Sequence, residues 1–222
     1  SLFTVLQPAS LGQNSLSVST PEADNSVKAE LASFAVGKEL QVNLFADESM
    51  GIANPVCMRW DARGRLWVLC TWAYPQLKPG VKPNDKLLIL EDTNGDAKAD
   101  EVFTYTDGLN MPTGFALGHG GAYIGNGREL LHVRDTTGDG KADKRVMLFS
   151  GFGTGDTHQT INSFAWSPGG ELFFSQGLHC FSRVQTPWGI RKLNEHGSWR
   201  LRPLRRQLHA HRRTSGGGNP WG

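Results

Sequence analysis

The chain has 222 residues, a formal net charge of +2, and 38% hydrophobic and 20% charged residues. These values are ordinary for a globular domain with an apolar core, and they exclude a largely disordered chain. The net charge is too small to indicate a polyanionic partner. No nucleic-acid motif accompanies the arginines near the C-terminal end, so we expect no nucleic-acid partner, and these arginines fit either a solvated strand edge or an acidic contact surface. No apolar run reaches the roughly 18–20 residues of a membrane span.

The first part of the chain, residues 1–37, is predicted to be a leader followed by a short helix. Thr20 and Pro21 supply an N-cap and a first-turn proline, and apolar residues then recur along one helix face up to Phe34. The sequence begins with Ser1, and its first residues lack the charged-then-apolar pattern of a signal peptide, which suggests a processed or truncated product. Residues 40–46 alternate apolar and polar side chains, the pattern of a half-buried strand.

The remainder, residues 38–222, repeats one layout of strand, tight turn and strand. The three copies begin at residues 54, 110 and 161, with the turns DARG, GHGG and SPGG, and a fourth copy opens at residues 219–222. The segments between the copies also match one another, so the repeating unit has four strands. An all-β class follows, because strand-forming runs alternate with turns that carry glycine.

A repeat of about 50 residues built from short hairpins is typical of β-propeller blades. Four strands per blade give about three to four blades, whereas blades of this length usually assemble in sixes or sevens. We therefore expect a partial β-propeller, which alone would expose strand edges and aggregate readily.

The cysteines match no CxxC, CxxCH or zinc-ligand spacing, so the chain itself has no predicted haem or zinc site. If Asp61 pairs with Leu66 across the DARG turn, Cys57 lies opposite Cys70. That position suits either a disulfide bond or two small core residues.

Two Asp-rich turns, DTNGDAKAD at residues 92–100 and DTTGDGKAD at residues 135–143, place side-chain oxygens at positions 1, 3, 5 and 9. Alternating oxygen ligands in a tight loop suit calcium, although neither loop is an EF-hand, because position 12 lacks glutamate. The alternative is that the aspartates only cap main-chain amides of good hairpin turns. The candidate ligands are Asp92, Asn94, Asp96, Asp100, Asp135, Thr137, Asp139 and Asp143.

A second candidate site lies in the segment at residues 151–177, where a Gly-rich, polar loop delivers Asp156 and His158 directly before a core strand. A histidine oriented by a carboxylate can accept a proton from a substrate hydroxyl near neutral pH. The alternative is a histidine that only satisfies a tight turn.

The hairpin repeat, the Asp-rich turns and the GFGTGDTHQTINSFAWSPGGELFFSQG segment together resemble a large propeller family known as membrane-bound dehydrogenases of planctomycete-type bacteria. That family is related to the glucose/sorbosone quinoprotein dehydrogenases. The resemblance covers nearly everything from about residue 28, but the basic stretch at residues 203–218 matches poorly.

The resemblance implies an exported protein of the periplasm or cell envelope that oxidises a sugar or other alcohol with pyrroloquinoline quinone. It implies that His158 is the base, that Asp156 is its acidic neighbour, and that a longer parent protein often carries a haem domain. The alternative function is a non-catalytic, calcium-stabilised propeller that binds carbohydrate or protein.

Overall fold

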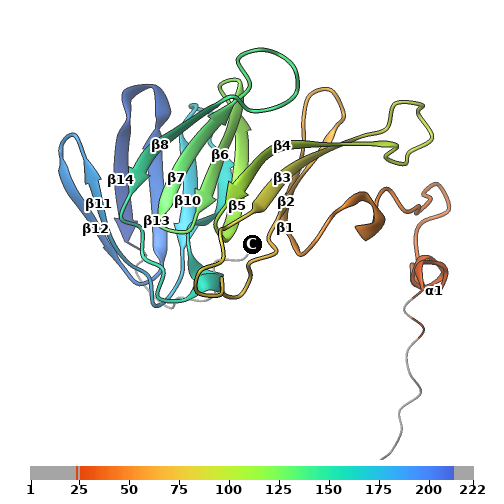
Figure 1. Cartoon of the computed structure of the whole chain (residues 1–222), viewed down its shortest axis with the longest axis horizontal. Helices are drawn as coiled ribbons and strands as arrows, with labels where there is room; N and C mark the ends of the chain where they lie inside the picture. The colour runs from red at the N-terminus through yellow and green to blue at the C-terminus, as the bar shows by residue number, and fades with distance from the viewer. Residues whose placement is uncertain (1–23, 25, 213–222) are drawn as a thin grey trace, which may run out of the picture. The chain divides into compact units, whose positions relative to one another are not determined.

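The computed structural model describes residue 24 and residues 26–212 (Figure 1). By their internal contacts, the residues divide into two units, residues 1–44 and residues 45–222. The first unit contains the only α-helix in the described part of the chain, and the second contains all the described strands. No described helix has the length and apolar character needed to cross a membrane.

The helix α1 (Val27–Ser33) begins later than the sequence predicted. Ser26 is its N-cap, and the Ser26 Oγ accepts a hydrogen bond from the Ala29 N–H at 3.2 Å. The predicted start at Thr20 and Pro21 lies outside the described residues. Residue 24 is not helical, and Ser26 has an extended backbone, so the first helical turn of α1 follows Ser26. Phe34, expected on the helical face, is the C-cap in an extended conformation.

The predicted hairpins form three open, four-stranded antiparallel sheets. In the first sheet the strand order is β1-β2-β3-β4, and in the second it is β5-β6-β7-β8. The first sheet consists of β1 (Pro55–Trp60), β2 (Leu66–Cys70), β3 (Asp85–Glu91) and β4 (Glu101–Leu109). The second consists of β5 (Pro112–Gly118), β6 (Gly121–Asn126), β7 (Glu129–Arg134) and β8 (Lys144–Ser150).

The third sheet interrupts this pattern with an inserted hairpin. Its order is β14-β13-β10-β9, and its strands are β9 (Asn162–Trp166), β10 (Leu172–Gln176), β13 (Gly197–Arg202) and β14 (Gln207–Arg212). Between β10 and β13 the chain forms a separate two-stranded sheet, β11 (Phe181–Thr186) and β12 (Gly189–Asn194). The basic stretch thus continues as the short 3₁₀ turn at Pro203–Arg205 and the edge strand β14, which fits the solvated-edge interpretation.

The first strands of the three sheets are neighbours. Strand β5 contacts both β1 and β9. One Arg59 guanidinium nitrogen on β1 also donates a hydrogen bond to the Phe164 carbonyl on β9 at 3.2 Å. The three sheets therefore share an inner edge and spread from it side by side (Figure 1).

Two apolar cores join the sheets. The first inter-sheet core lies between the first and second sheets and contains Trp67, Leu69, Leu87, Ile89, Tyr105, Leu109, Phe115, Ala122, Ile124, Leu131 and Val133. The second inter-sheet core lies between the second and third sheets. It is built around Phe152, Phe164, Phe174 and Trp199, which make edge and stacked ring contacts.

Two local expectations were wrong. Residues 40–46 form no strand, because none of the described strands forms a ladder with this segment. The β1–β2 hairpin pairs Trp60, and not Asp61, with Leu66, so Cys57 lies opposite Leu69 and the predicted Cys57–Cys70 register does not form; a bulge beyond Cys57 then leaves Pro55 opposite Cys70. Both thiols are free, and Cys70 is a buried core residue.

Candidate functional site

The loop before β9 brings Asp156 and His158 into direct contact. Asp156 caps the 3₁₀ turn η2 (Thr157–Gln159), and its Oδ1 accepts the His158 N–H at 3.0 Å. The same oxygen lies 2.8 Å from Nδ1 of the His158 ring. The His158 side chain is 52% exposed, so the ring is both oriented and open to a ligand.

The hydrogen bonds define which ring nitrogen can act as a base. Bonds from the His158 side chain and main chain lower the pKa of Asp156, so its carboxyl group is ionised at neutral pH. An ionised carboxylate can only accept, so neutral His158 donates from Nδ1–H and keeps a lone pair on Nε2. Among the described residues, nothing hydrogen-bonds to Nε2. An imidazole in this state can take a proton from a hydroxyl group.

Gln159 supports the pair from the other side, a role the sequence did not reveal although the residue adjoins His158. Its Nε2 donates to Asp156 Oδ2 at 3.2 Å, while its main-chain carbonyl accepts the Gly177 N–H at 2.8 Å and the Cys180 thiol at 2.9 Å. Burial raises the pKa of the Cys180 thiol to about 11, so Cys180 is protonated and is no nucleophile.

Three alternate glycines hold this loop close to the chain that leads into β11. A Cβ at Gly153 would lie 2.4 Å from the Phe181 nitrogen, and a Cβ at Gly155 would lie 2.2 Å from the His179 carbonyl oxygen. A third glycine, Gly151, meets the Arg183 carbonyl in the same way. Any side chain here would push the loop away, so the glycines fix where Asp156 lies.

Tyr74 brings the first sheet to the site. Its ring makes an edge contact with the His158 ring, with centroids 5.2 Å apart. Tyr74 lies in the β2–β3 loop, and a fully buried carboxylate, Asp85, organises that loop. Asp85 accepts hydrogen bonds from Thr71 Oγ1, Trp72 N–H and Ala73 N–H at 2.9, 2.7 and 3.0 Å.

Sequence reasoning missed both Tyr74 and Asp85. Tyr74 is far from His158 in the chain, and only the path of the β2–β3 loop brings the rings together. Asp85 also accepts the Met111 N–H at 2.9 Å, which ties the β2–β3 loop to the start of the second sheet. Four donors on one buried carboxylate were not detectable from any local motif.

The Asp-rich turns form the β3–β4 and β7–β8 connections, and their carboxylates face their own main chain. Asp92 accepts the Gly95 and Ala97 N–H groups at 2.7 and 2.8 Å, and Asp135 accepts those of Gly138 and Gly140 at 2.6 and 2.8 Å. These hydrogen bonds lower the pKa of Asp135, so that carboxylate stays ionised.

The other candidate ligands behave similarly. Asn94, Asp96 and Asp139 each accept a hydrogen bond from the main-chain N–H two residues later. Asp100 and Asp143 accept hydrogen bonds from the hydroxyl groups of Thr93 and Thr136. The Thr137 hydroxyl donates to Asp135. Within the described range, no group of three His, Cys, Asp or Glu side chains is placed to hold a metal ion. The oxygens that would bind calcium already serve as turn acceptors, although a carboxylate oxygen has a second lone pair to offer.

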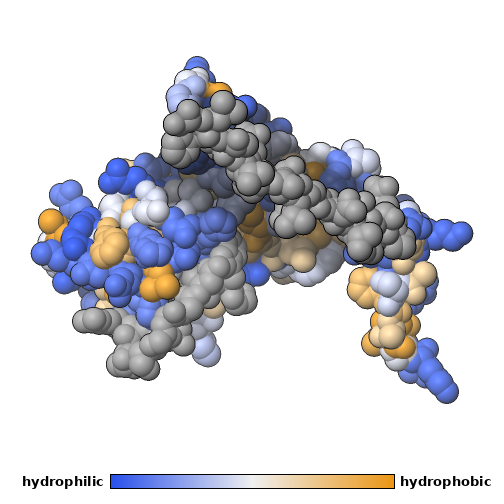
Figure 2. All heavy atoms as spheres, turned by 90° about the horizontal axis from the view of Figure 1, so that it is seen from below, coloured by the Kyte–Doolittle hydropathy of each residue, from blue (hydrophilic) through white to orange (hydrophobic). Residues whose placement is uncertain are grey.

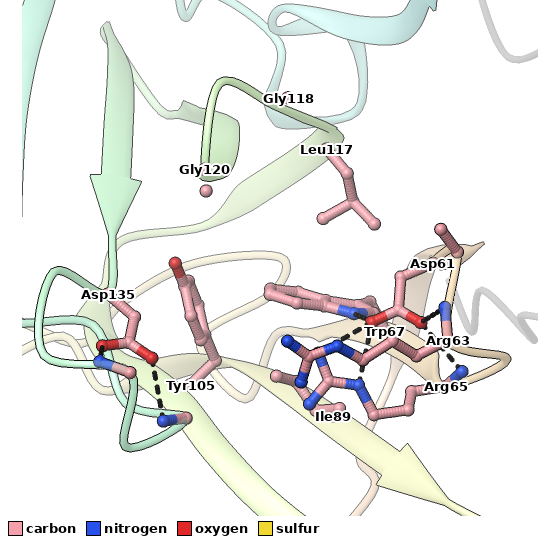
Figure 3. Close-up of a pocket in the computed structure, with 14 residues that line it drawn as sticks. Asp61, Arg63, Arg65, Trp67, Ile89, Tyr105, Leu117, Gly118, Gly120 and Asp135 are labelled. Atoms are coloured by element: carbon pink, nitrogen blue, oxygen red, sulfur yellow. Dashed lines mark hydrogen bonds and ion pairs between the residues drawn. The ribbon is translucent and has the colours of Figure 1, made fainter.

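A separate pocket of about 540 Å³ lies where β1 and β5 end (Figure 3). His158, in contrast, lies shortly before β9. Asp135 and Tyr105 border one side, and Arg63 and Arg65 border the other. Asp61 binds Arg65 at 2.8 Å, and Asp135 is held by its own turn, so the acidic groups of this pocket are already engaged. The pocket assembles no proton-transfer pair, and we therefore assign the candidate active site to His158.

Seen from below, the molecule has polar side chains over much of the sheets, with apolar groups scattered among them (Figure 2).

A search of curated proteins gives no match to this chain. The model of a family described as a domain of unknown function, DUF7133, matches residues 26–222. Because that match covers most of the sequence, the chain belongs to the DUF7133 family.

Proposed function

We propose that this chain is part of a propeller dehydrogenase that oxidises a sugar or other alcohol, with His158 as the general base. The observation that carries the proposal is the 2.8 Å contact between His158 Nδ1 and Asp156 Oδ1 on a ring that remains half exposed. The three adjoining four-stranded sheets support the propeller architecture. By resemblance, the protein would be exported to the periplasm or cell envelope.

In the proposed reaction, His158 Nε2 accepts the hydroxyl proton of the substrate while the carbon-bound hydrogen leaves as hydride. Asp156 keeps the Nδ1–H tautomer and stabilises the imidazolium that forms. Gln159 holds the second Asp156 oxygen, and Tyr74 limits the ring orientations of His158. The hydride acceptor implied by the resemblance is pyrroloquinoline quinone, which takes up two electrons.

The described residues fit the base better than they fit the quinone. Pyrroloquinoline quinone is a polycarboxylate, and its binding calls for cationic side chains. The groups that lower the pKa of Asp156 are His158, through its hydrogen bonds, and His179. The quinone-binding residues would therefore come from other parts of a longer protein, together with any haem domain.

The test is dye reduction by the complete gene product with calcium, pyrroloquinoline quinone and a panel of sugars and alcohols. We expect His158→Ala to lower kcat by about 10²–10⁴-fold, the usual contribution of general base catalysis. The matched control is His211→Ala, since His211 is exposed on β14. Equal dye reduction by the wild-type protein and His158→Ala would refute the role of His158.

One observation favours the second candidate function, a non-catalytic, calcium-stabilised module that binds carbohydrate or protein. A groove of about 360 Å³ beside the β2–β3 loop is lined by Trp72, which is 46% exposed, and by Lys86, which lies over its ring at 5.3 Å. An exposed tryptophan in a groove can stack on a sugar ring. Sugar binding that is lost in Trp72→Ala, without dye reduction by any variant, would favour this function.

A further inference from the structure

The two Asp-rich turns make the same contact with a preceding stretch of chain. In the second sheet, the Ala142 N–H donates to the Tyr105 carbonyl on β4 of the first sheet at 2.7 Å. In the first sheet, the Ala99 N–H at the same turn position donates to the Phe45 carbonyl at 2.8 Å. Phe45 therefore occupies, relative to the first sheet, the place that Tyr105 occupies relative to the second.

The sequence around Phe45 repeats that of the fourth strands β4 and β8. Each has valine, then an aromatic residue three positions later, then a small residue. The matching sets are Val42, Phe45 and Ala46; Val102, Tyr105 and Thr106; and Val146, Phe149 and Ser150. Residues 41–46 thus carry the pattern of a fourth strand, yet they form no ladder in the described structure.

The face of the first sheet against which Phe45 packs is only partly covered by described residues. In the second sheet, Ala122, Ile124, Leu131 and Val133 pack against the whole preceding sheet through the first inter-sheet core. The equivalent residues of the first sheet, which follow the same turn and strand positions, are Leu66, Val68, Leu88 and Leu90. Among the described residues, the apolar groups packed against them are Phe45, Ala46, Met50 and Ile52 of one short stretch, and Ala99 of their own turn.

The inner strand β1 gives independent evidence of a missing neighbour. Met58 and Trp60 on β1 are 62% and 57% exposed. In β5, which lies between two inner strands, the residues from Pro112 to Ala116 are all buried. Within the range that the structure describes, the first sheet therefore has no neighbouring sheet on this side, whereas the second sheet has one.

We propose that residues 41–46 are the fourth strand of a further sheet, whose other three strands come from polypeptide outside the described residues. The partner is a three-stranded antiparallel sheet with an apolar face that covers Leu66, Val68, Leu88 and Leu90. Its third strand pairs with residues 41–46 as β3 pairs with β4 and β7 with β8. That strand should therefore resemble KLLILE and ELLHVR, the sequences of residues 86–91 and 129–134.

Such an arrangement joins a segment that precedes the first sheet to a sheet made elsewhere in the protein, which would link distant parts of a ring of sheets. The main-chain hydrogen bonds of strand addition would supply affinity, and the alternating apolar side chains would set the register. The inference is independent of the proposed chemistry, because no residue of the His158 site takes part.

The test compares amide hydrogen exchange in this 222-residue chain and in the complete gene product. We expect the amides of Val42 and Leu44 to exchange freely in the 222-residue chain. In the complete product they should exchange as slowly as those of Val102 and Thr104 on β4. Val42→Pro, which removes a strand N–H, should lower the Tm of the complete product by several degrees and leave that of the 222-residue chain unchanged.

The matched control is Lys38→Pro, which lies in the turn before the segment and should change neither Tm. Free exchange at Val42 and Leu44 in both proteins would overturn the proposal. So would slow exchange in the dilute 222-residue chain, which would mean pairing within it. Protection that grows with the concentration of that chain would point to a second copy as the partner and would also overturn it.

Discussion

At the scale of single residues, the buried carboxylate of Asp85 does more to place the site than any residue in a recognisable motif. It gathers four donors from two loops, and one of those loops carries Tyr74 to His158. If Asp85 were replaced by asparagine, one of the two accepting oxygens would become an NH2 group, and the donors that face it would lose their acceptor.

We predict that Asp85→Asn destabilises the protein by about 3 kcal/mol, because a buried acceptor of several hydrogen bonds is lost. Chemical denaturation of both proteins measures the difference in free energy of unfolding. The matched control is Asp107→Asn, an exposed position on β4, for which we expect a change within about 0.5 kcal/mol. Equal stability of Asp85→Asn and the wild type would mean that the loop needs no carboxylate.

Asp61 should make stability depend on acid pH. Burial raises the pKa of Asp61, but hydrogen bonds from Trp67 and Arg65 outweigh burial, so the pKa lies below the ordinary value of 3.8. Because the pKa is lower in the folded state, Asp61 contributes fully to the free energy of unfolding at any pH above its pKa in the unfolded chain, about 4. That contribution is lost as the pH falls through the pKa of Asp61 in the folded protein.

The corresponding variant is Asp61→Asn, which we expect to cost about 2 kcal/mol near neutral pH, since the Trp67 and Arg65 donors lose a charged acceptor. The difference in unfolding free energy between wild type and variant should be constant above about pH 5 and shrink below about pH 4. Urea denaturation across this range measures it. A difference that stays the same down to about pH 2 would contradict the assignment.

Part of the site was predictable at this scale, for a physical reason. Asp156 and His158 are two residues apart in a tight turn, so local chain geometry alone brings their side chains together. The contact between Tyr74 and His158 depends instead on a long loop whose path is set by Asp85. Local patterns contain no information on that path.

At the scale of elements, the Asp-rich turns combine three roles that sequence spacing cannot separate. They reverse the chain, satisfy their own amides, and donate a hydrogen bond to a preceding stretch of chain, from Ala99 to Phe45 and from Ala142 to Tyr105. The spacing of their oxygens predicted calcium, and the hydrogen bonds favour a turn that is already formed. A metal ion would then add to an existing loop.

We predict that calcium binds these turns and raises the Tm, more through the first turn than through the second, where Thr137 replaces an amide ligand. Calcium at 100 times its Kd would stabilise the protein by about 2.7 kcal/mol. Metal analysis and thermal unfolding with and without chelator measure the effect. Asp92→Asn should reduce it, whereas Asp47→Asn, outside the turns, should not. No bound calcium and an unchanged Tm would leave the turns as hairpin connections only.

Elements also differ in how far their sequences predict them. The hairpins around DARG, GHGG and SPGG were predictable, because alternating strands and glycine turns specify a hairpin locally. The segment at residues 40–46 has an equally good strand pattern and forms no strand, since a strand also needs a neighbour. The inserted β11–β12 hairpin was not predicted, because it breaks the repeat on which the strand count was based.

At the scale of the whole molecule, the three sheets form a row whose apolar cores lie between neighbouring sheets, and the Arg59–Phe164 hydrogen bond links the inner strands of the first and third sheets. The two inter-sheet cores share no residue, and the second sheet contributes to both. The repeat predicted successive similar sheets, but only the structure identifies which face of each sheet is buried. That face depends on the order of the sheets around their common inner edge.

This arrangement predicts how mutations combine. Ile89→Val in the first inter-sheet core and Ile161→Val in the second should each cost about 1 kcal/mol, and their double variant should be additive within about 0.5 kcal/mol, because their cores are separate. The matched comparison is Ile89→Val with Ile124→Val, because both residues lie in the first inter-sheet core. We expect these two substitutions to be non-additive, since side chains that relax into the space left by one methyl group change the packing around the other. Double-mutant cycles from chemical denaturation measure both couplings. If the pair from separate cores coupled as strongly as the pair within one core, stability would be a property of one continuous core and not of neighbouring sheets.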